Sequence, residues 1–222
     1  MNIIISPAKK MNVNNDDLVN EYKPVFMDKT NILYDKLKSL SYDELKKLLA
    51  CNDDIAELNY DRYKYMNLDK NLSPAILTYE GIQYKYMSPD SFSEEEFNYI
   101  KSHLKILSGF YGVLNPFDGV VPYRLEMQAK LKVEDSKNLY EFWGDSLYKE
   151  LRKESNVILN LASKEYSKCI EKYLSDDDVF ITCVFGELNE DGKISESERM
   201  EIEKAVSKAL ENLQENQKGE ER

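Results

Sequence analysis

The sequence predicts a mixed α/β fold, in which helices surround one sheet of parallel and antiparallel strands. Three short apolar runs, rich in β-branched residues and bounded by turn or charged residues, are typical of buried strands. They cover residues 3–6, 157–161 and 179–185. Helical patterns, with apolar residues three and four positions apart, lie between these runs. The alternation of the two patterns along the chain indicates an α/β domain.

Four helices are predicted before residue 110, at 32–40, 41–49, 53–65 and 93–107. Two of them begin with a capping box, in which a Ser and a Glu three residues later satisfy each other's backbone N–H groups. We expect Ile55 and Leu58 to face inward from the third helix. The apolar stripe of the fourth is formed by Phe97, Ile100, Leu104 and Leu107. The looser alternation of residues 74–86, interrupted by Gly81, predicts a strand, a bulge and a second strand.

The chain has neither internal repeats nor a Gly/Ser linker that would divide it. Residues 1–194 are therefore predicted to form a single domain, with a helical portion at about 25–70. Residues 195–222 form a distinct acidic tail, in which a narrow apolar stripe from Ile202 to Leu213 predicts a helix. This helix is expected to dock on the domain or on a partner protein.

The charge balance disfavours general nucleic-acid binding but allows a local basic surface. The chain has 30 Lys and Arg against 41 Asp and Glu, a formal net charge of −11. Binding to phosphates needs clustered Lys and Arg. Between residues 101 and 132, however, the only acids are Asp118 and Glu126. The basic residues of that window are Lys101, Lys105, Arg124, Lys130 and Lys132.

Cysteine and histidine usage indicates a cytoplasmic protein without a metal site or cofactor. The three cysteines are widely spaced and contain no C-x-x-C pair, as expected in a reducing compartment. His103 is the only histidine, so a zinc site is not expected, and no Gly-x-Ser-x-Gly nucleophile motif occurs. The first residues do not form a signal peptide, and no apolar run approaches the ~20 residues of a membrane span.

Residues 104–127 carry the strongest functional pattern, a Gly-x-x-Gly hairpin followed by a Pro/Gly loop. One interpretation is a helix-hairpin-helix module, whose exposed backbone N–H groups grip DNA phosphates. Its hairpin residues would be Ser108, Gly109, Tyr111 and Gly112. The other interpretation is a helix that ends at Gly109 and is followed by a packed loop. Asn115-Pro116 interrupts the second helix of the module and favours this alternative.

The next segment, Pro122 to Met127, places polar residues on one face if it is extended. Arg124 and Glu126 would share that face, opposite Tyr123, Leu125 and Met127. Arg124 could clamp a phosphate or carboxylate while Glu126 orients it or acts as a base. The alternative is a surface ion pair worth ~0–1 kcal/mol.

Other polar residues follow the predicted strands, where sheets commonly bind ligands. Lys9 follows the first strand, and Asn160, Ser163 and Glu165 lie at the end of the second. Trp143 and Asp145 lie in the sequence Phe-Trp-Gly-Asp. Together with Arg124 and Glu126 these residues predict a cleft for a small anionic ligand. A plain helix cap is the alternative role for Ser163.

Six ordered segments resemble the YaaA peroxide-stress protein family. They are Ile4–Lys9, Ile55–Arg62, Leu104–Pro116, Pro122–Met127, Phe142–Asp145 and Asn160–Tyr166. The resemblance implies a cytosolic bacterial protein with a YaaA-type fold, a positively charged cleft and a helix-hairpin-helix-like element. It also implies binding to double-stranded DNA, survival of hydrogen peroxide and limitation of free intracellular iron.

The resemblance covers about residues 1–194 and ends where the acidic tail begins. Family members usually continue with a basic helix, whereas this chain has Ser195-Glu-Ser-Glu. Two functions therefore remain open: a DNA-binding stress protein, or an enzyme acting on a phosphorylated or nucleotide-like small molecule held by Arg124 and Glu126. A third, iron handling by carboxylates, is disfavoured because the Asp and Glu residues show no ligand pattern.

Overall fold

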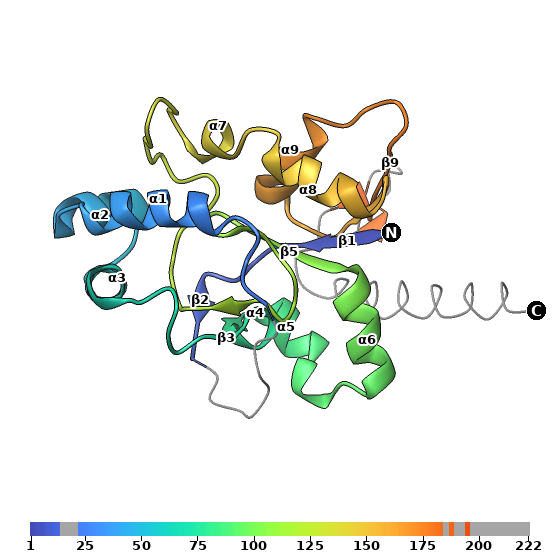
Figure 1. Cartoon of the computed structure of the whole chain (residues 1–222), viewed down its shortest axis with the longest axis horizontal. Helices are drawn as coiled ribbons and strands as arrows, with labels where there is room; N and C mark the ends of the chain where they lie inside the picture. Colours follow the sequence, from blue (N-terminus) through green and yellow to red (C-terminus); the bar gives the residue numbers. More distant parts are fainter. Residues whose placement is uncertain (14–21, 184–186, 189–193, 196–222) are drawn as a thin grey trace, which may run out of the picture.

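A five-stranded mixed sheet forms the centre of the fold (Figure 1). The computed structural model describes residues 1–13, 22–183, 187–188 and 194–195. The strands of the sheet, in the spatial order β6-β5-β1-β8-β9, are β6 (Gly112–Leu114), β5 (Leu104–Ser108), β1 (Asn2–Ile5), β8 (Val157–Asn160) and β9 (Val179–Thr182). All neighbours are parallel except β6, which runs antiparallel to β5. The predicted mixed α/β fold is confirmed.

The register of the sheet brings two predicted site segments together. Ile4 of β1 lies opposite Asn160 of β8 and, on its other side, opposite Lys105 of β5. Because β1 and β8 are parallel, both end at the same edge of the sheet. The loop that carries Lys9 and the loop that carries Ser163 therefore leave the sheet side by side.

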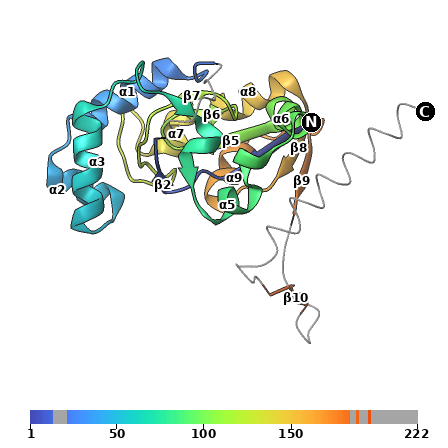
Figure 2. The ribbon, with the colours of Figure 1, turned by 90° about the horizontal axis from the view of Figure 1, so that it is seen from below.

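The helical portion consists of α1 (Met27–Lys38), α2 (Tyr42–Leu49) and α3 (Asp53–Tyr65). These helices lie at one end of the molecule, away from α6 and β9, in both views (Figures 1 and 2). The capping box at Ser41 is present. The prediction that Leu58 faces inward from α3 is wrong, because this residue is 51% exposed. Ala56, Asn59 and Tyr63 face inward instead, because the Tyr63 hydroxyl bonds the backbone of Arg124 and sets the buried face.

Short elements occupy residues 73–91, a region that includes the predicted strand, bulge and strand at 74–86. They are β3 (Ser73–Pro74), α4 (Ala75–Thr78), β4 (Tyr79–Glu80), α5 (Ile82–Met87) and the 3₁₀ helix η1 (Pro89–Ser91). Only β4 matches the prediction, and it pairs with β2 (Lys10–Met11). The prediction is wrong elsewhere because the Thr78 side chain donates to the carbonyl of Pro74 and supports a helical turn.

The fourth predicted helix ends earlier than its apolar pattern suggests. α6 (Glu94–His103) begins with the predicted capping box at Ser93, but Leu104 and Leu107 belong to β5. Residues 104–108 are buried and pair with β1 on one side and β6 on the other. These ladder hydrogen bonds and the burial outweigh the helical periodicity of the isolated sequence.

The remaining elements complete the described part of the chain. They are β7 (Gly119–Val120), α7 (Leu139–Trp143), α8 (Ser146–Glu154) and α9 (Lys164–Glu171), with β10 (Glu187–Leu188) paired to β11 (Ile194–Ser195). Figure 1 shows α8 and α9 above β1, and α6 below it. Of the helices in the described ranges, none has the length and apolar character needed to cross a membrane. Most of the acidic tail, residues 196–222, lies outside the described residues, as do 184–186 of the third predicted strand.

Candidate functional site

The Gly-x-x-Gly segment is the turn of a β-hairpin between β5 and β6. The helix-hairpin-helix prediction for this segment is wrong because strands flank the turn on both sides. Its backbone N–H groups are also unavailable to DNA, since those of Phe110 and Tyr111 donate to the buried Ser108 hydroxyl. The alternative, a helix ending at Gly109, is wrong as well, because the helix ends at His103.

Both glycines of the hairpin have a packing role instead. A Cβ on Gly109 would lie 2.5 Å from the carbonyl oxygen of Leu125, so only glycine permits this close approach. Gly112 has a φ of 80° and leaves no room beside Phe26 and Trp143. The hairpin therefore supports the segment that carries Arg124 and Glu126.

Trp143 and Asp145, both predicted to line a cleft, lie elsewhere. Trp143 is buried, and its indole N–H donates to the carbonyl of Gly109 at 3.1 Å. It thereby holds the hairpin turn in place. Asp145 precedes α8 and forms a 2.7 Å ion pair with Lys149.

The segment from Pro122 to Met127 is arranged as its sequence predicts. Tyr123, Leu125 and Met127 are buried, whereas Arg124 and Glu126 are half-buried on the opposite face. The Tyr63 hydroxyl donates to the Arg124 carbonyl at 2.7 Å and lies 3.3 Å from the Arg124 backbone nitrogen, which donates to it. An aromatic residue of α3 therefore fixes the backbone of the site segment.

A pocket of about 400 Å³ opens where β1 and β8 end, and we call it the sheet-edge pocket. Six of the predicted cleft residues line it: Lys9, Arg124, Glu126, Asn160, Ser163 and Glu165. The other lining residues are Ser6, Pro7, Ala8, Gln83, Tyr123, Leu125, Leu161, Ala162, Tyr166 and Cys183. The sequence does not single out Gln83, because no strand-end pattern marks it; α5 brings it to the pocket.

A cluster of three charged groups lies on one wall of the pocket. The same carboxylate oxygen of Glu126 lies 3.0 Å from the Lys9 ammonium and 3.1 Å from the Arg124 guanidinium. One negative charge therefore faces two positive charges. The side chains of Arg124 and Glu126 are only 14% and 16% exposed, so solvent screens their interaction less than that of a surface pair.

Two hydrogen-bond donors in the pocket wall have no partner among the described residues. They are the Nε of Arg124 and the amide nitrogen of Gln83, both buried from solvent. A buried donor without a partner is destabilising by about 1–3 kcal/mol. Both nitrogens belong to residues that line the pocket, and an oxygen or nitrogen acceptor that reached them from the pocket would supply the missing partner.

The residues at the end of β8 stabilise the rim of the pocket. The Asn160 side chain accepts from the backbone N–H of Ala162 and donates to the Thr182 hydroxyl, which satisfies this buried amide. Ser163 occupies the N-cap of α9 without a capping bond from its side chain. Its backbone N–H donates to the Ser6 hydroxyl at 2.8 Å, and this bond joins the loops that follow β1 and β8.

A buried chain of hydroxyl groups backs the pocket. The Tyr123 hydroxyl lies 2.6 Å from the Ser108 hydroxyl and 2.8 Å from that of Tyr79. Burial raises the pKa of Tyr123 to about 12, so the phenol stays protonated near neutral pH. These hydroxyls serve as neutral hydrogen-bonding groups that hold the site segment against the hairpin.

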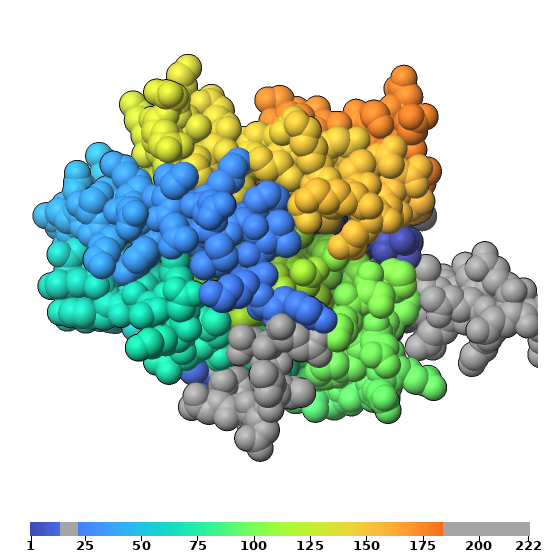
Figure 3. Space-filling model, viewed as in Figure 1, coloured from blue at the N-terminus to red at the C-terminus, as the bar shows by residue number. Residues whose placement is uncertain are grey.

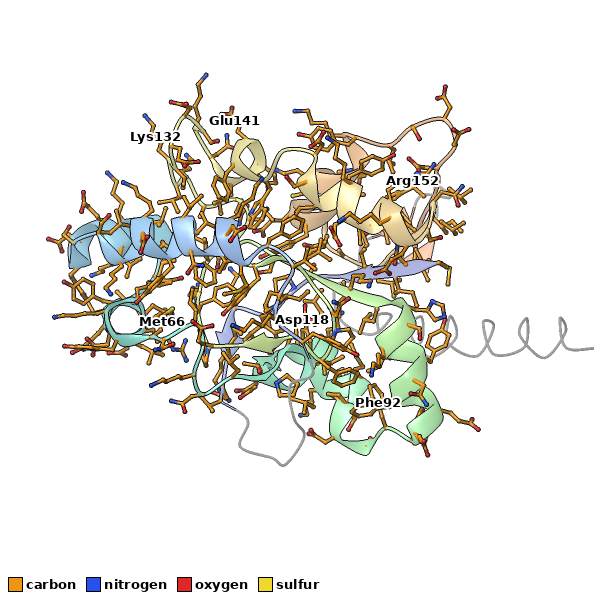
Figure 4. All side chains as sticks on the ribbon, in the orientation of Figure 1. Met66, Phe92, Asp118, Lys132, Glu141 and Arg152 are labelled. Carbon is orange, nitrogen blue, oxygen red and sulfur yellow. The ribbon has the colours of Figure 1, made fainter. Side chains whose placement is uncertain are left out.

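A second hollow, of about 730 Å³, lies between α1, α2 and the segment 126–132, and we call it the lysine groove. It is lined by Lys36, Lys47, Lys130 and Lys132, with Glu44 and Glu126 as its acids. Figure 3 shows the blue helices α1 and α2 against the yellow segment before α7, and Figure 4 shows Lys132 on that segment.

The predicted basic window is therefore divided between different sites. Arg124, Lys130 and Lys132 line the two hollows just described, whereas Lys105 is buried and bonded to Asn115 and Glu154. Lys101 lines a third hollow with Lys105. Within the described part of the chain, no cluster of three or more His, Cys, Asp or Glu residues is placed to hold a metal ion.

The fold and site define a mixed α/β protein with a charged pocket at the carboxyl edge of its sheet. Its sequence matches the family model described as peroxide stress protein YaaA over residues 1–204, and the chain belongs to this family. A UPF0246 protein of Desulfitobacterium hafniense is 59% identical over 88% of this chain and 78% of its own length. A UPF0246 protein of Lachnoclostridium phytofermentans is 57% identical over 84% of this chain and 73% of its own length. One of Pediococcus pentosaceus is 50% identical over 88% of this chain and 78% of its own length.

Proposed function

We propose that this protein binds double-stranded DNA in the cytoplasm, without sequence preference, as part of the response to hydrogen peroxide. The observation that carries the proposal is the lysine groove. Its four lysines come from α1, α2 and the segment 126–132, and they line one hollow. Lysines that contact phosphates hold DNA without reading its sequence.

The groove lysines are available to an external anion. Lys47, Lys130 and Lys132 are exposed, and Lys36 is half-buried. Among the described residues, no carboxylate lies within ion-pair distance of any of the four. A polyanion can therefore occupy the groove without breaking an internal ion pair.

Because the net charge of the chain is −11, we expect DNA to bind at the lysine groove and not over the whole surface. A surface with this overall charge repels phosphates, so the attraction has to come from a local cluster of positive charge. We therefore expect weak binding outside the groove and a steep dependence of affinity on salt.

The test is fluorescence anisotropy of a labelled duplex, titrated with the full chain between 50 and 200 mM salt. The double variant K130Q/K132Q should bind more weakly and reduce the slope of log K against log salt by about 2. The control K149Q/K153Q removes two exposed lysines outside both hollows and should change little. Equal losses in both variants, or binding insensitive to salt, would sink the proposal.

A second candidate is an enzyme acting on a phosphorylated or nucleotide-like small molecule in the sheet-edge pocket. The buried Nε of Arg124, which has no partner among the described residues, favours it. Arg124 would hold the anionic group while Glu126 moves a proton. A thermal-shift screen with nucleotides tests this function. It is abandoned if none raises the melting temperature, or if R124Q leaves the rise unchanged.

The family resemblance supports a further part of the proposal, that the protein helps to limit free intracellular iron. Equilibrium dialysis of the full chain against ferrous iron without oxygen tests whether the protein retains the ion itself. Retention above that of a control protein of equal charge supports direct binding. No retention overturns direct binding of iron by this chain.

A further inference from the structure

The sheet-edge pocket and the lysine groove are neighbours. Glu126 lines both hollows, and the segment from Arg124 to Lys132 extends from one to the other. Lys9, at the mouth of the pocket, is 64% exposed. A DNA strand with phosphates on Lys130 and Lys132 would therefore bring a neighbouring nucleotide to the pocket.

The pocket wall combines hydrogen-bond donors and acceptors. Its donors are the unpartnered Nε of Arg124 and the unpartnered amide nitrogen of Gln83. Its acceptors are the carboxylates of Glu126 and Glu165. A phosphate only accepts hydrogen bonds, so it would pair with the donors and leave the carboxylate acceptors unused. The edge of a nucleobase presents donors and acceptors together and matches such a wall.

The rest of the lining is suited to the flat face of a base. Pro7, Ala8, Leu161 and Ala162 line the pocket and are only half-buried, so they offer apolar surface to a ligand, and the buried Tyr123, Leu125 and Tyr166 lie behind them. Aromatic and apolar side chains bind bases by stacking, which depends little on base identity. The volume of about 400 Å³ falls in the usual range for small-molecule pockets.

We infer that the sheet-edge pocket receives one base of the bound DNA, turned out of the base stack, while the phosphates stay on the lysines. The inference rests on the proposed DNA binding. Arg124 and Gln83 donate to the edge of the base, and Glu126 or Glu165 accepts from it. A mismatched or damaged base is the easiest to turn out, so the pocket selects weakened base pairs.

The experiment uses duplexes that carry 2-aminopurine either in a matched pair or in a mismatch. The fluorescence of this base rises when it leaves the stack, and a fluorescein label on the same duplex reports binding by anisotropy. With the full chain we expect a rise of about threefold or more for the mismatch and a smaller one for the matched pair.

Two pocket variants separate base capture from DNA binding. Q83L removes an amide nitrogen that has no internal partner, so it should fold normally, and R124Q removes the charged donor. Both variants should lose most of the fluorescence rise at protein concentrations where anisotropy still reports bound duplex, because the lysine groove is unchanged. K130Q/K132Q should instead lose binding and the fluorescence rise together.

The remaining outcomes decide against base capture in different ways. Anisotropy that reports binding, with unchanged 2-aminopurine fluorescence, overturns the inference and leaves the proposed function standing. An equal fluorescence rise in wild type, Q83L and R124Q overturns it too, because the base then leaves the stack without the pocket. If DNA does not bind while free AMP raises the melting temperature, both the inference and DNA binding fail. If neither ligand binds, both fail as well.

Discussion

The Leu125 carbonyl oxygen lies 2.5 Å from the position that a Cβ on Gly109 would occupy. The β5–β6 hairpin and the segment carrying Arg124 and Glu126 are therefore in direct backbone contact. The hairpin glycine that resembles part of a DNA-binding motif instead supports the wall of a pocket.

Substitution of Gly109 by alanine should destabilise the protein and displace the site segment. The added methyl group meets backbone atoms, which yield less easily than a flexible side chain, so we expect a loss of about 1–3 kcal/mol in urea unfolding. Gly81→Ala is the control, because its Cβ would meet only the Ala8 methyl group at 3.1 Å. Equal stability of G109A and wild type would contradict the packing argument.

Trp143→Phe should destabilise the fold because it leaves the Gly109 carbonyl without its hydrogen-bond donor. The substitution removes the indole N–H that donates to this buried oxygen. We expect a loss of about 1–3 kcal/mol from the unsatisfied carbonyl, in addition to the lost packing. Thermal and urea unfolding measure it, with the exposed Tyr42→Phe as the control for removal of a hydrogen bond. A larger loss in the control would show that the indole bond contributes little.

The free energy of unfolding should fall as pH rises from about 4 to 6, because the buried Asp118 loses its proton over this range. This residue lies in the interior (Figure 4), and burial raises its pKa from 3.8 to about 6. Because the folded state holds the proton more tightly, this contribution is complete below the unfolded pKa and lost above the folded one. The rise in pKa corresponds to about 3 kcal/mol.

The pH dependence is measured by urea unfolding of the wild type and Asp118→Asn from pH 3.5 to 7.5. The difference in stability between the two proteins should change by a few kcal/mol across this range and level off at both ends. A constant difference would mean that Asp118 keeps an ordinary pKa in the folded protein.

Asn160→Ala should cost more stability than Asn156→Ala, although both residues belong to the region of β8. Asn160 is buried, and its loss leaves the Ala162 N–H without an acceptor. We expect about 1–3 kcal/mol, whereas Asn156 bonds Asp177 in a more exposed position. Unfolding in urea gives both values, and the reverse order would show that the buried amide is not needed to hold the rim.

Local patterns in the sequence predict those elements whose formation depends on nearby residues. The capping boxes at Ser41 and Ser93 predict the beginnings of α2 and α6 because both partners of each bond lie within four residues. Strict alternation at 122–127 likewise predicts which side chains are buried. The end of α6 was not predictable in this way, because it depends on pairing with distant β1.

The difference between local and distant contacts also explains which residues of the candidate site could be predicted. Polar residues after apolar strands placed Lys9, Asn160, Ser163 and Glu165 at one edge of the sheet. The sequence could not place Gln83, which reaches the pocket through the packing of α5, or Trp143, which bonds the hairpin.

The sequence alone determined the α/β class, the family and the starts of α2 and α6, since apolar periodicity, ordered motifs and capping boxes act over a few residues. Only the tertiary structure decided that residues 104–108 form a strand and not the end of a helix, because they pair with β1, which lies about 100 residues earlier in the chain. It also decided which charges meet at Glu126, since Lys9 reaches it from the loop that follows β1.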